Sequence, residues 1–211
     1  MLTSSNLLTI PFPNTICFWL WKSSKAVRAV KNSGLWIILK LYLIDNLFVV
    51  TGFQEKEVRR ALTGLNVKFI HNPSYETGQA SSVTVAIENL PEQYDSALIG
   101  LADMPFVTAE LIDRLIETHN LLPKPETRIT LPLINGERSN PVIWGKAFFD
   151  ELQNISGDQG GRQILSAYLS AINGVSWEKM QIAEDIDIPE DRNKLSSIHW
   201  KQKRTTIFVN L

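Results

Sequence analysis

The chain has 211 residues, of which 44% are hydrophobic and 20% are charged, and its length suits one globular domain with one core. Its formal net charge of −1 excludes the strongly basic footprint of a nucleic-acid-binding domain, so no nucleic-acid partner is expected. The single cysteine, Cys17, excludes an internal disulfide and a metal-thiolate cluster, which fits a reducing compartment such as the cytoplasm.

Two apolar stretches lie near the start of the chain, at residues 16–21 and 35–50. The second is short for a membrane span and is interrupted by Lys40 and Asp45. The first is shorter still, and the positive residues that a signal peptide carries do not precede it. We therefore expect no membrane segment and interpret both stretches as core or as misread sequence.

From residue 46 onward, apolar strand patterns alternate with amphipathic helix patterns. Strands are predicted at 46–52, 67–73 and 96–103, and helices at 54–62, 81–90 and 108–119. In the last helix Thr108 suits the N-cap position, and an apolar stripe follows it, formed by Leu111, Ile112, Leu115 and Ile116. This alternation implies right-handed crossovers and a largely parallel sheet, and the continuous apolar strands favour a sheet covered on both faces.

The second half of the chain continues the α/β pattern with a hairpin inserted. Two strands, 128–134 and 140–145, are joined by the turn-prone segment 135–139. Further helices are predicted at 148–152 and 160–172, and a late strand at 177–182. The predicted fold is therefore a three-layer α/β domain.

The strand "SALIGLAD" ends on a carboxylate, Asp103, which is followed by Met104 and Pro105. In open α/β sheets, ligands bind beyond the carboxyl ends of the strands. An acid at that edge can hold a divalent cation, while backbone amides and helix N-termini hold phosphates. The alternative is an acid that caps a turn before Pro105.

Three other segments carry candidate binding residues. In "AEDIDIPED" (183–191), Asp185 and Asp187 lie two apart and therefore on the same side of an extended segment, although an acidic surface turn would look the same. The segment "HNPSYETGQASSV" (71–83) places small residues and hydroxyls where a base or ribose could approach the backbone, or it is a loop with a helix cap from Ser81 or Ser82. The glycine-rich turn "SGDQGGR" (156–162) opens a helix and could receive an anion, although ordinary helix starts share this pattern.

Two histidines need separate consideration. His71 begins the segment 71–83, and His119 is the last residue of the helix predicted at 108–119. Neither has a paired nucleophile or a second histidine at metal-ligand spacing. His119 ends a predicted helix, where a cation would suit the helix dipole. Core or capping roles are therefore expected for both.

The order of these segments resembles the molybdenum-cofactor nucleotidyltransferases, and within them the molybdopterin cytidylyltransferase branch of the MobA/MocA-like group. The resemblance covers residues 46–195 and rests on "ALIGLADMPFVT", "SGDQGGRQIL" and "DIDIPED". It implies a Rossmann-like nucleotidyltransferase fold with a mostly parallel central sheet. It also implies a magnesium- or manganese-dependent transfer of NMP from an NTP to a phosphorylated acceptor, with release of pyrophosphate.

The resemblance also assigns roles to particular residues. Asp103 matches the metal-binding acid of the family, and Asp187 matches its second metal-side acid, with Ile188 in place of a threonine. Gly78 and Ser82, with Ser81 beside them, fall in the segment that approaches the nucleotide. The residues in segments that line the acceptor side are Asn140, Pro141, Asp158 and Arg162.

The implied donor is CTP rather than GTP, and the implied acceptor is molybdopterin. Two alternatives remain open at this point. One is the same fold acting on another phosphorylated acceptor, such as a sugar phosphate or methylerythritol phosphate. The other is an inactive domain that binds a partner, for instance a molybdoenzyme maturation factor.

Residues 1–45 depart from the family pattern. The family begins with L-A-A-G-x-S-x-R-M-G-x-x-K, whose amides, arginine and lysine carry the triphosphate, whereas this segment contains one glycine, Gly34. The segment has the length that the family pattern requires, but its residues do not match that pattern, which suggests that it is translated out of frame. If so, one of the other two reading frames of the encoding DNA would contain the glycine-rich motif. The basic residues between Lys22 and Lys31 recur three apart and suit a solvated helix face better than a phosphate cradle. We therefore divide the chain into an aberrant segment (1–45), a nucleotidyltransferase domain (46–195) and a basic tail (196–211).

Overall fold

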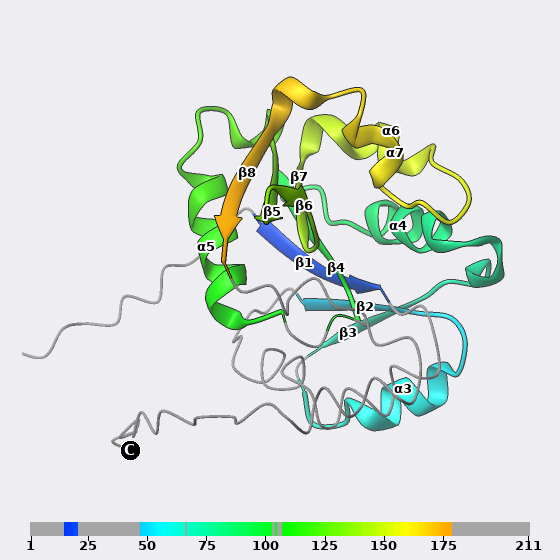
Figure 1. The fold of residues 1–211 in the computed structure, drawn as a ribbon. Helices are drawn as coiled ribbons and strands as arrows, with labels where there is room; N and C mark the ends of the chain where they lie inside the picture. The colour runs from blue at the N-terminus through cyan, green and yellow to red at the C-terminus, as the bar shows by residue number, and fades with distance from the viewer. Residues whose placement is uncertain (1–14, 21–46, 66, 103, 105–106, 179–211) are drawn as a thin grey trace, which may run out of the picture.

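The computed structural model describes residues 15–20, 47–65, 67–102, 104 and 107–178. Three layers are visible in it, with a central sheet and helices on both faces (Figure 1). Helices α3 (Glu55–Ala61) and α5 (Ala109–Asn120) contribute to one apolar core, and α4 (Gln79–Glu88), α6 (Phe149–Gln153) and α7 (Arg162–Leu165) contribute to the other. The expectation of a three-layer α/β domain is confirmed.

The described strands form one eight-stranded sheet in the order β3-β2-β1-β4-β7-β5-β6, with β8 pairing β5. Their bounds are β1 Thr15–Leu20, β2 Leu47–Thr51, β3 Lys68–His71, β4 Ser96–Leu101, β5 Ile129–Ile134, β6 Glu137–Arg138, β7 Val142–Gly145 and β8 Ile172–Trp177. Strands β3, β2, β1 and β4 are parallel, as the alternating pattern predicts. This half of the sheet places the carboxyl ends of its four strands at one edge.

The other half of the sheet is mixed, so the prediction of a mostly parallel sheet holds only in part. Strand β7 is antiparallel to β4 and to β5, and β6 is antiparallel to β5, whereas β8 is parallel to β5. The cause is local, because Asn135 and Gly136 both have positive φ and form a tight hairpin turn after β5. The connections between β5, β6 and β7 are too short for a crossover, so these strands can pair only antiparallel.

The strands of the parallel half are buried on both faces. Leu47, Val49 and Leu98 face the core that includes α3 and α5. Phe48 and Val50 face the opposite core. Each fully buried aliphatic side chain contributes roughly 1.5–3 kcal/mol of transfer free energy, so these continuous apolar strands fix the position of the sheet edge on which the loops are built.

Strand β1 lies at the centre of the parallel half, between β2 and β4. Its register pairs Cys17 with Leu47 on one side and with Leu98 on the other. The segment that departs from the family pattern thus supplies a central strand. Its sequence "TICFWL" is rich in β-branched and aromatic residues, which have high strand propensity.

Helix α5 follows its predicted pattern closely. The Thr108 hydroxyl accepts a hydrogen bond from the Leu111 backbone amide at 3.3 Å, which caps the helix N-terminus. The predicted apolar stripe is buried, with Leu111 and Leu115 fully so. Capping and periodicity together therefore place this helix against the sheet.

The helix predicted at 160–172 is too long, because the structure has only α7 and a 3-10 turn at Leu169–Ala171 there. The chain then forms β8, Ile172–Trp177, which the sequence does not predict, and the strand predicted at 177–182 lies mostly outside the described residues. Strand β8 pairs with the whole of β5, and its Gly174 leaves room for the Leu133 side chain. The polar residues within β8 conceal its strand character, which depends on the pairing with β5.

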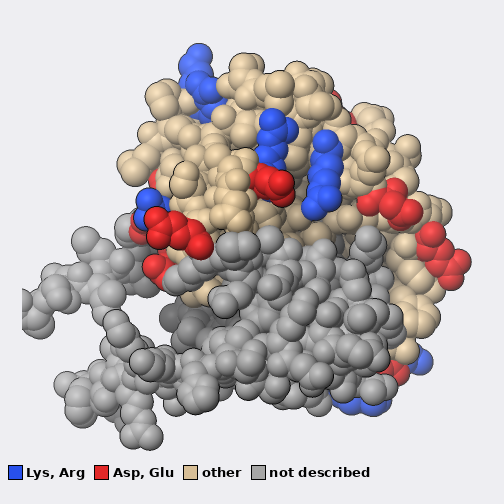
Figure 2. All heavy atoms as spheres, in the orientation of Figure 1, with Lys and Arg blue, Asp and Glu red and all other residues tan. Residues whose placement is uncertain are grey.

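Figure 2 shows acidic and basic side chains interspersed over the described surface on this face. Within the described ranges, no helix is both long and apolar enough to cross a membrane. Neither acidic nor basic side chains dominate the described surface on the face that Figure 2 shows.

His119 is a neutral core residue and not the cation that its helix-terminal position suggests. Its ring hydrogen-bonds Ser96 Oγ through Nε2 (2.8 Å) and Thr130 Oγ1 through Nδ1 (2.9 Å), and all three side chains are buried. Burial lowers the pKa of His119 from 6.5 to about 4. Desolvation outweighs the helix dipole here, and of the two expected roles the core role is the correct one.

The lowered pKa of His119 predicts a loss of stability in acid. The His119 ring takes up a proton near pH 6.5 in the unfolded chain and only near pH 4 in the folded chain. The free energy of unfolding is therefore unaffected by this group above pH 6.5, and it decreases as the pH falls from 6.5 toward 4. Over that interval we expect a loss of about 3 kcal/mol of unfolding free energy from this group. Urea unfolding of the wild type and of His119→Gln between pH 7 and about pH 4 measures it, because the variant lacks this titration. Equal pH dependence in the two proteins would contradict the assignment.

Candidate functional site

The candidate site lies at the edge where the parallel strands β2, β3, β1 and β4 end. The last residue of β4 is Leu101, and Ala102 and Met104, on either side of Asp103, are both buried. Asp103 itself lies outside the described residues. Its two neighbours nevertheless anchor the chain at the carboxyl edge of the sheet, which is the edge that the sequence predicts.

The loop between β3 and α4 is organised around Asn72, which is fully buried. The Asn72 amide nitrogen donates to Ser81 Oγ and Ser82 Oγ, both at 2.9 Å, and its Oδ1 accepts from the Ser74 backbone amide at 2.9 Å. Ser81 Oγ also lies 3.0 Å from the Ser74 carbonyl oxygen and 2.9 Å from that of Gly78. The two serines predicted to approach a nucleotide are therefore also part of the internal hydrogen bonding of their own loop.

Gly78 touches the glycine-rich turn 156–162. Its φ is 113°, and a Cβ added there would lie 2.7 Å from both Asp158 Oδ1 and the Gly157 carbonyl oxygen. The Ala80 backbone amide donates to that same carbonyl oxygen at 3.0 Å, and the Gln79 side chain packs against Gly160. The structure thus brings one predicted nucleotide-side residue, Gly78, against the predicted acceptor-side residue Asp158.

The other three predicted acceptor-side residues, Asn140, Pro141 and Arg162, are not part of this contact. Asn140 is half-buried and precedes Pro141 through a cis peptide bond. Because Val142 pairs with Ile99 in antiparallel register, Asn140 lies at the same sheet edge as the end of β4. Arg162 is exposed at the start of α7, and among the described residues no hydrogen bond or ion pair joins it or Asn140 to Gly78 or Asp158.

The predicted metal ligands Asp103 and Asp187 both lie outside the described residues. Within the part of the chain that the structure describes, no group of three or more His, Cys, Asp or Glu side chains could hold a metal ion. The donor set expected from the sequence, two carboxylates, is of the hard-oxygen type that Mg²⁺ and Mn²⁺ prefer.

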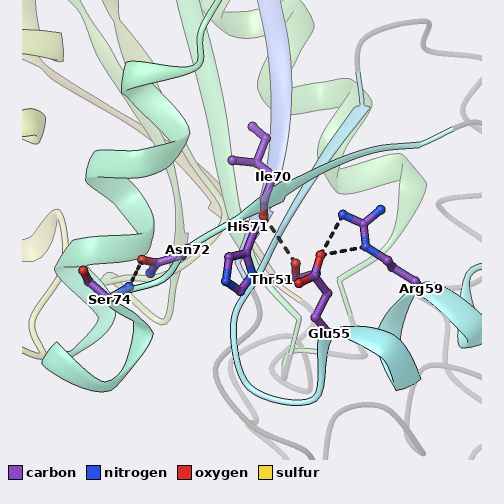
Figure 3. A network of polar contacts seen from close by, with 7 residues as sticks. All are labelled: Thr51, Glu55, Arg59, Ile70, His71, Asn72 and Ser74. Atoms are coloured by element: carbon purple, nitrogen blue, oxygen red, sulfur yellow. Dashed lines mark hydrogen bonds and ion pairs between the residues drawn. The ribbon is translucent and has the colours of Figure 1, made fainter.

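A charged network that the sequence analysis missed ties α3 to the ends of β2 and β3 (Figure 3). Glu55 pairs with Arg59 (Oε1 to Nη2, 2.7 Å) and with His71 (Oε2 to Nδ1, 2.8 Å). The hydrogen bond from Arg59 lowers the pKa of Glu55. The i, i+4 spacing of Glu55 and Arg59 is the signal that could have identified the first pair. The His71 side chain is half-exposed and joins the end of β3 to the first residue of α3, so it is neither a core nor a capping residue.

Comparison with known proteins identifies the family. The model of the MobA-like NTP transferase domain matches residues 36–172. The chain belongs to this family. Its members are nucleotidyltransferases, as the resemblance implies. The match begins at residue 36, so most of the segment 1–45, which departs from the family pattern, lies outside it.

Individual relatives agree with this MobA-like assignment. The chain is 26% identical over 152 residues to the molybdenum cofactor cytidylyltransferase of Escherichia coli, an alignment that covers 72% of this chain and 74% of the relative. It is also 34% identical over 76 residues to the bifunctional protein GlmU of Francisella tularensis, of which the alignment spans only 16%.

Solved structures support the fold of this MobA-like domain. A Mycobacterium tuberculosis protein, Rv0371c, crystallised with manganese, superposes with a TM-score of 0.68 at 18% identity, covering 86% of this chain and 97% of that one. A 4-diphosphocytidyl-2C-methyl-D-erythritol synthase from Anaerococcus prevotii superposes with a TM-score of 0.65 at 12% identity, covering 87% and 95%. The expected Rossmann-like nucleotidyltransferase fold is confirmed.

Proposed function

We propose that this chain transfers CMP from CTP to a phosphorylated acceptor, with molybdopterin as the first candidate, and releases pyrophosphate. The observation that carries the proposal is the identity with the Escherichia coli molybdenum cofactor cytidylyltransferase across 72% of this chain. The alternative donor, GTP, and other phosphorylated acceptors are outcomes of the test below.

The contact between Gly78 and the 156–162 turn supports a transfer between two bound substrates. In the proposal, Gly78, Ser81 and Ser82 face the nucleotide, and Asn140, Asp158 and Arg162 line the acceptor side. The Gly157 carbonyl oxygen accepts from the Ala80 amide at 3.0 Å, so the two segments form one hydrogen-bonded unit. Joining the two binding segments in this way holds the reacting groups at a short, fixed separation, which is the main requirement of such a transfer.

The proposed reaction needs positioning more than proton transfer. An oxygen of the acceptor phosphate forms a bond to the α-phosphorus of CTP, and the bond from that phosphorus to the bridging oxygen of the β-phosphate breaks. The nucleophile is already an anion, so no side chain has to remove a proton. The exposed guanidinium of Arg162 suits the acceptor phosphate, because its planar donors match phosphate oxygens. Asp103 and Asp187 are the residues proposed to hold Mg²⁺ or Mn²⁺, which would neutralise the charge of the triphosphate.

Calorimetric titration of the full chain with CTP and then GTP, each with Mg²⁺, tests the donor assignment. Saturable binding of CTP, tighter than that of GTP, is expected, and pyrophosphate release with molybdopterin should follow. The test is demanding because residues 1–45 lack the family's glycine-rich triphosphate motif. Binding of neither nucleotide would overturn the proposal in favour of an inactive, partner-binding domain. Binding of CTP without turnover of molybdopterin would direct the search to other phosphorylated acceptors.

A further inference from the structure

Asn72 is a buried side chain with several hydrogen bonds at the carboxyl edge of the described sheet, and none of the sequence motifs assigns it a role. It is fully buried, and both polar atoms of its side chain are hydrogen-bonded within the protein. Its backbone amide donates to the Thr51 carbonyl oxygen at 2.7 Å, which attaches it to the end of β2. A buried amide with this many partners acts on the geometry of its surroundings, because loss of any one bond leaves a polar group unpaired.

The side-chain partners of Asn72 come from the two ends of one loop. Its Oδ1 holds the Ser74 amide at the start of the turn that follows β3, and its amide nitrogen holds Ser81 and Ser82 in the first turn of α4. Asn72 therefore fixes both ends of the segment that contains Gly78. Ser81 Oγ in turn lies within hydrogen-bonding distance of the carbonyls of Ser74 and Gly78, which closes the network across the loop.

We infer that Asn72 is the positioning residue for the nucleotide side of the site: it acts through Ser81, Ser82 and the 74–78 turn and does not touch substrate. The inference rests on the proposed function, since it takes this loop as the nucleotide side. It deepens that proposal by naming the residue that sets the shape of the loop before the nucleotide arrives. A loop shaped in advance binds more tightly, because the cost of ordering it is removed from binding.

Asn72→Leu tests the inference, because leucine has a similar size and makes none of the hydrogen bonds. The matched control is Thr130→Val, which removes a hydrogen bond from the buried trio with His119 and Ser96. Ser96 is the first residue of β4, so this trio lies at the opposite edge of the sheet. Both variants should lose stability, and the comparison separates loss of stability from loss of loop geometry.

Two measurements on the full chain decide the question. Hydrogen exchange of the free protein should become faster across residues 74–82 in Asn72→Leu and not in Thr130→Val. Titration with CTP and Mg²⁺ should show an affinity lower by about tenfold or more in Asn72→Leu, with wild-type affinity in Thr130→Val.

Each contrary result has a distinct meaning. Unchanged exchange over 74–82 in Asn72→Leu, or wild-type CTP affinity in that variant despite a loosened loop, would overturn the positioning role. Failure of the wild type itself to bind any nucleotide would overturn the proposed function and the nucleotide-side role together, and the exchange data would still report whether Asn72 holds the loop.

Discussion

Replacing Asp103 with asparagine should abolish Mn²⁺ binding and lower CMP transfer by more than about a hundredfold. The substitution keeps the size of the side chain and removes the negative charge. In the sequence, Asp103 follows a strand whose residues are buried from Ser96 to Gly100, and it is the acid that the family resemblance assigns to the metal. Electron paramagnetic resonance titration with Mn²⁺ reads the metal directly, independently of turnover.

The matched control for Asp103→Asn is Glu117→Gln. Glu117 is an exposed acid on α5, away from the carboxyl ends of the parallel strands, and its neutralisation changes the net charge by the same amount. It should leave both Mn²⁺ binding and transfer unchanged. An Mn²⁺ titration of Asp103→Asn that matches the wild type would remove Asp103 from the metal site.

Replacing Gly78 with alanine should lower CTP affinity or transfer by about ten- to a hundredfold, because displacements near 1 Å at a reacting site have effects of this size. The added Cβ would lie 2.7 Å from the Gly157 carbonyl oxygen, and backbone cannot swing away as a flexible side chain can. The substitution also forces alanine to φ 113°, which costs roughly 1–3 kcal/mol. The 156–162 turn must therefore move, and the contact between the two binding segments opens.

Gly64→Ala separates the two effects of Gly78→Ala. Gly64 also has positive φ, 88°, but nothing lies within 4 Å of a Cβ added there. It should lose stability through backbone strain and keep wild-type CTP affinity. Thermal unfolding and CTP titration of both variants make the comparison, and equal effects on affinity would show that the contact with Gly157 is irrelevant to binding.

The sequence predicts the parallel half of the fold well, because periodicity and capping there depend on neighbouring residues. Helix α5 begins at its predicted cap, Thr108, and β2 ends within the predicted run. Strand β8 was missed, because "INGVSW" becomes a strand only through its pairing with β5, more than 35 residues earlier in the chain.

In the candidate site, too, the features set by neighbouring residues could be predicted from the sequence, and the contacts between distant segments could not. The edge of the sheet on which it lies follows from strand order, but the contact of Gly78 with Gly157 joins segments that no periodicity relates. Asn72 stands in an Asn-Pro pair that indicates a turn, and its role in that turn depends on serines nine and ten residues later. The hydrogen bonds of the buried His119 likewise join it to partners from two different strands, β4 and β5.

Pairing in the sheet and binding of a triphosphate require different things of the segment that contains strand β1. Its place between Leu47 and Leu98 is defined by amide and carbonyl groups, which every non-proline residue carries. Holding a triphosphate instead requires particular glycines and cations. The backbone can therefore keep the sheet position of β1 with many different side chains, so the fold of this chain and its ability to bind a triphosphate are separate properties.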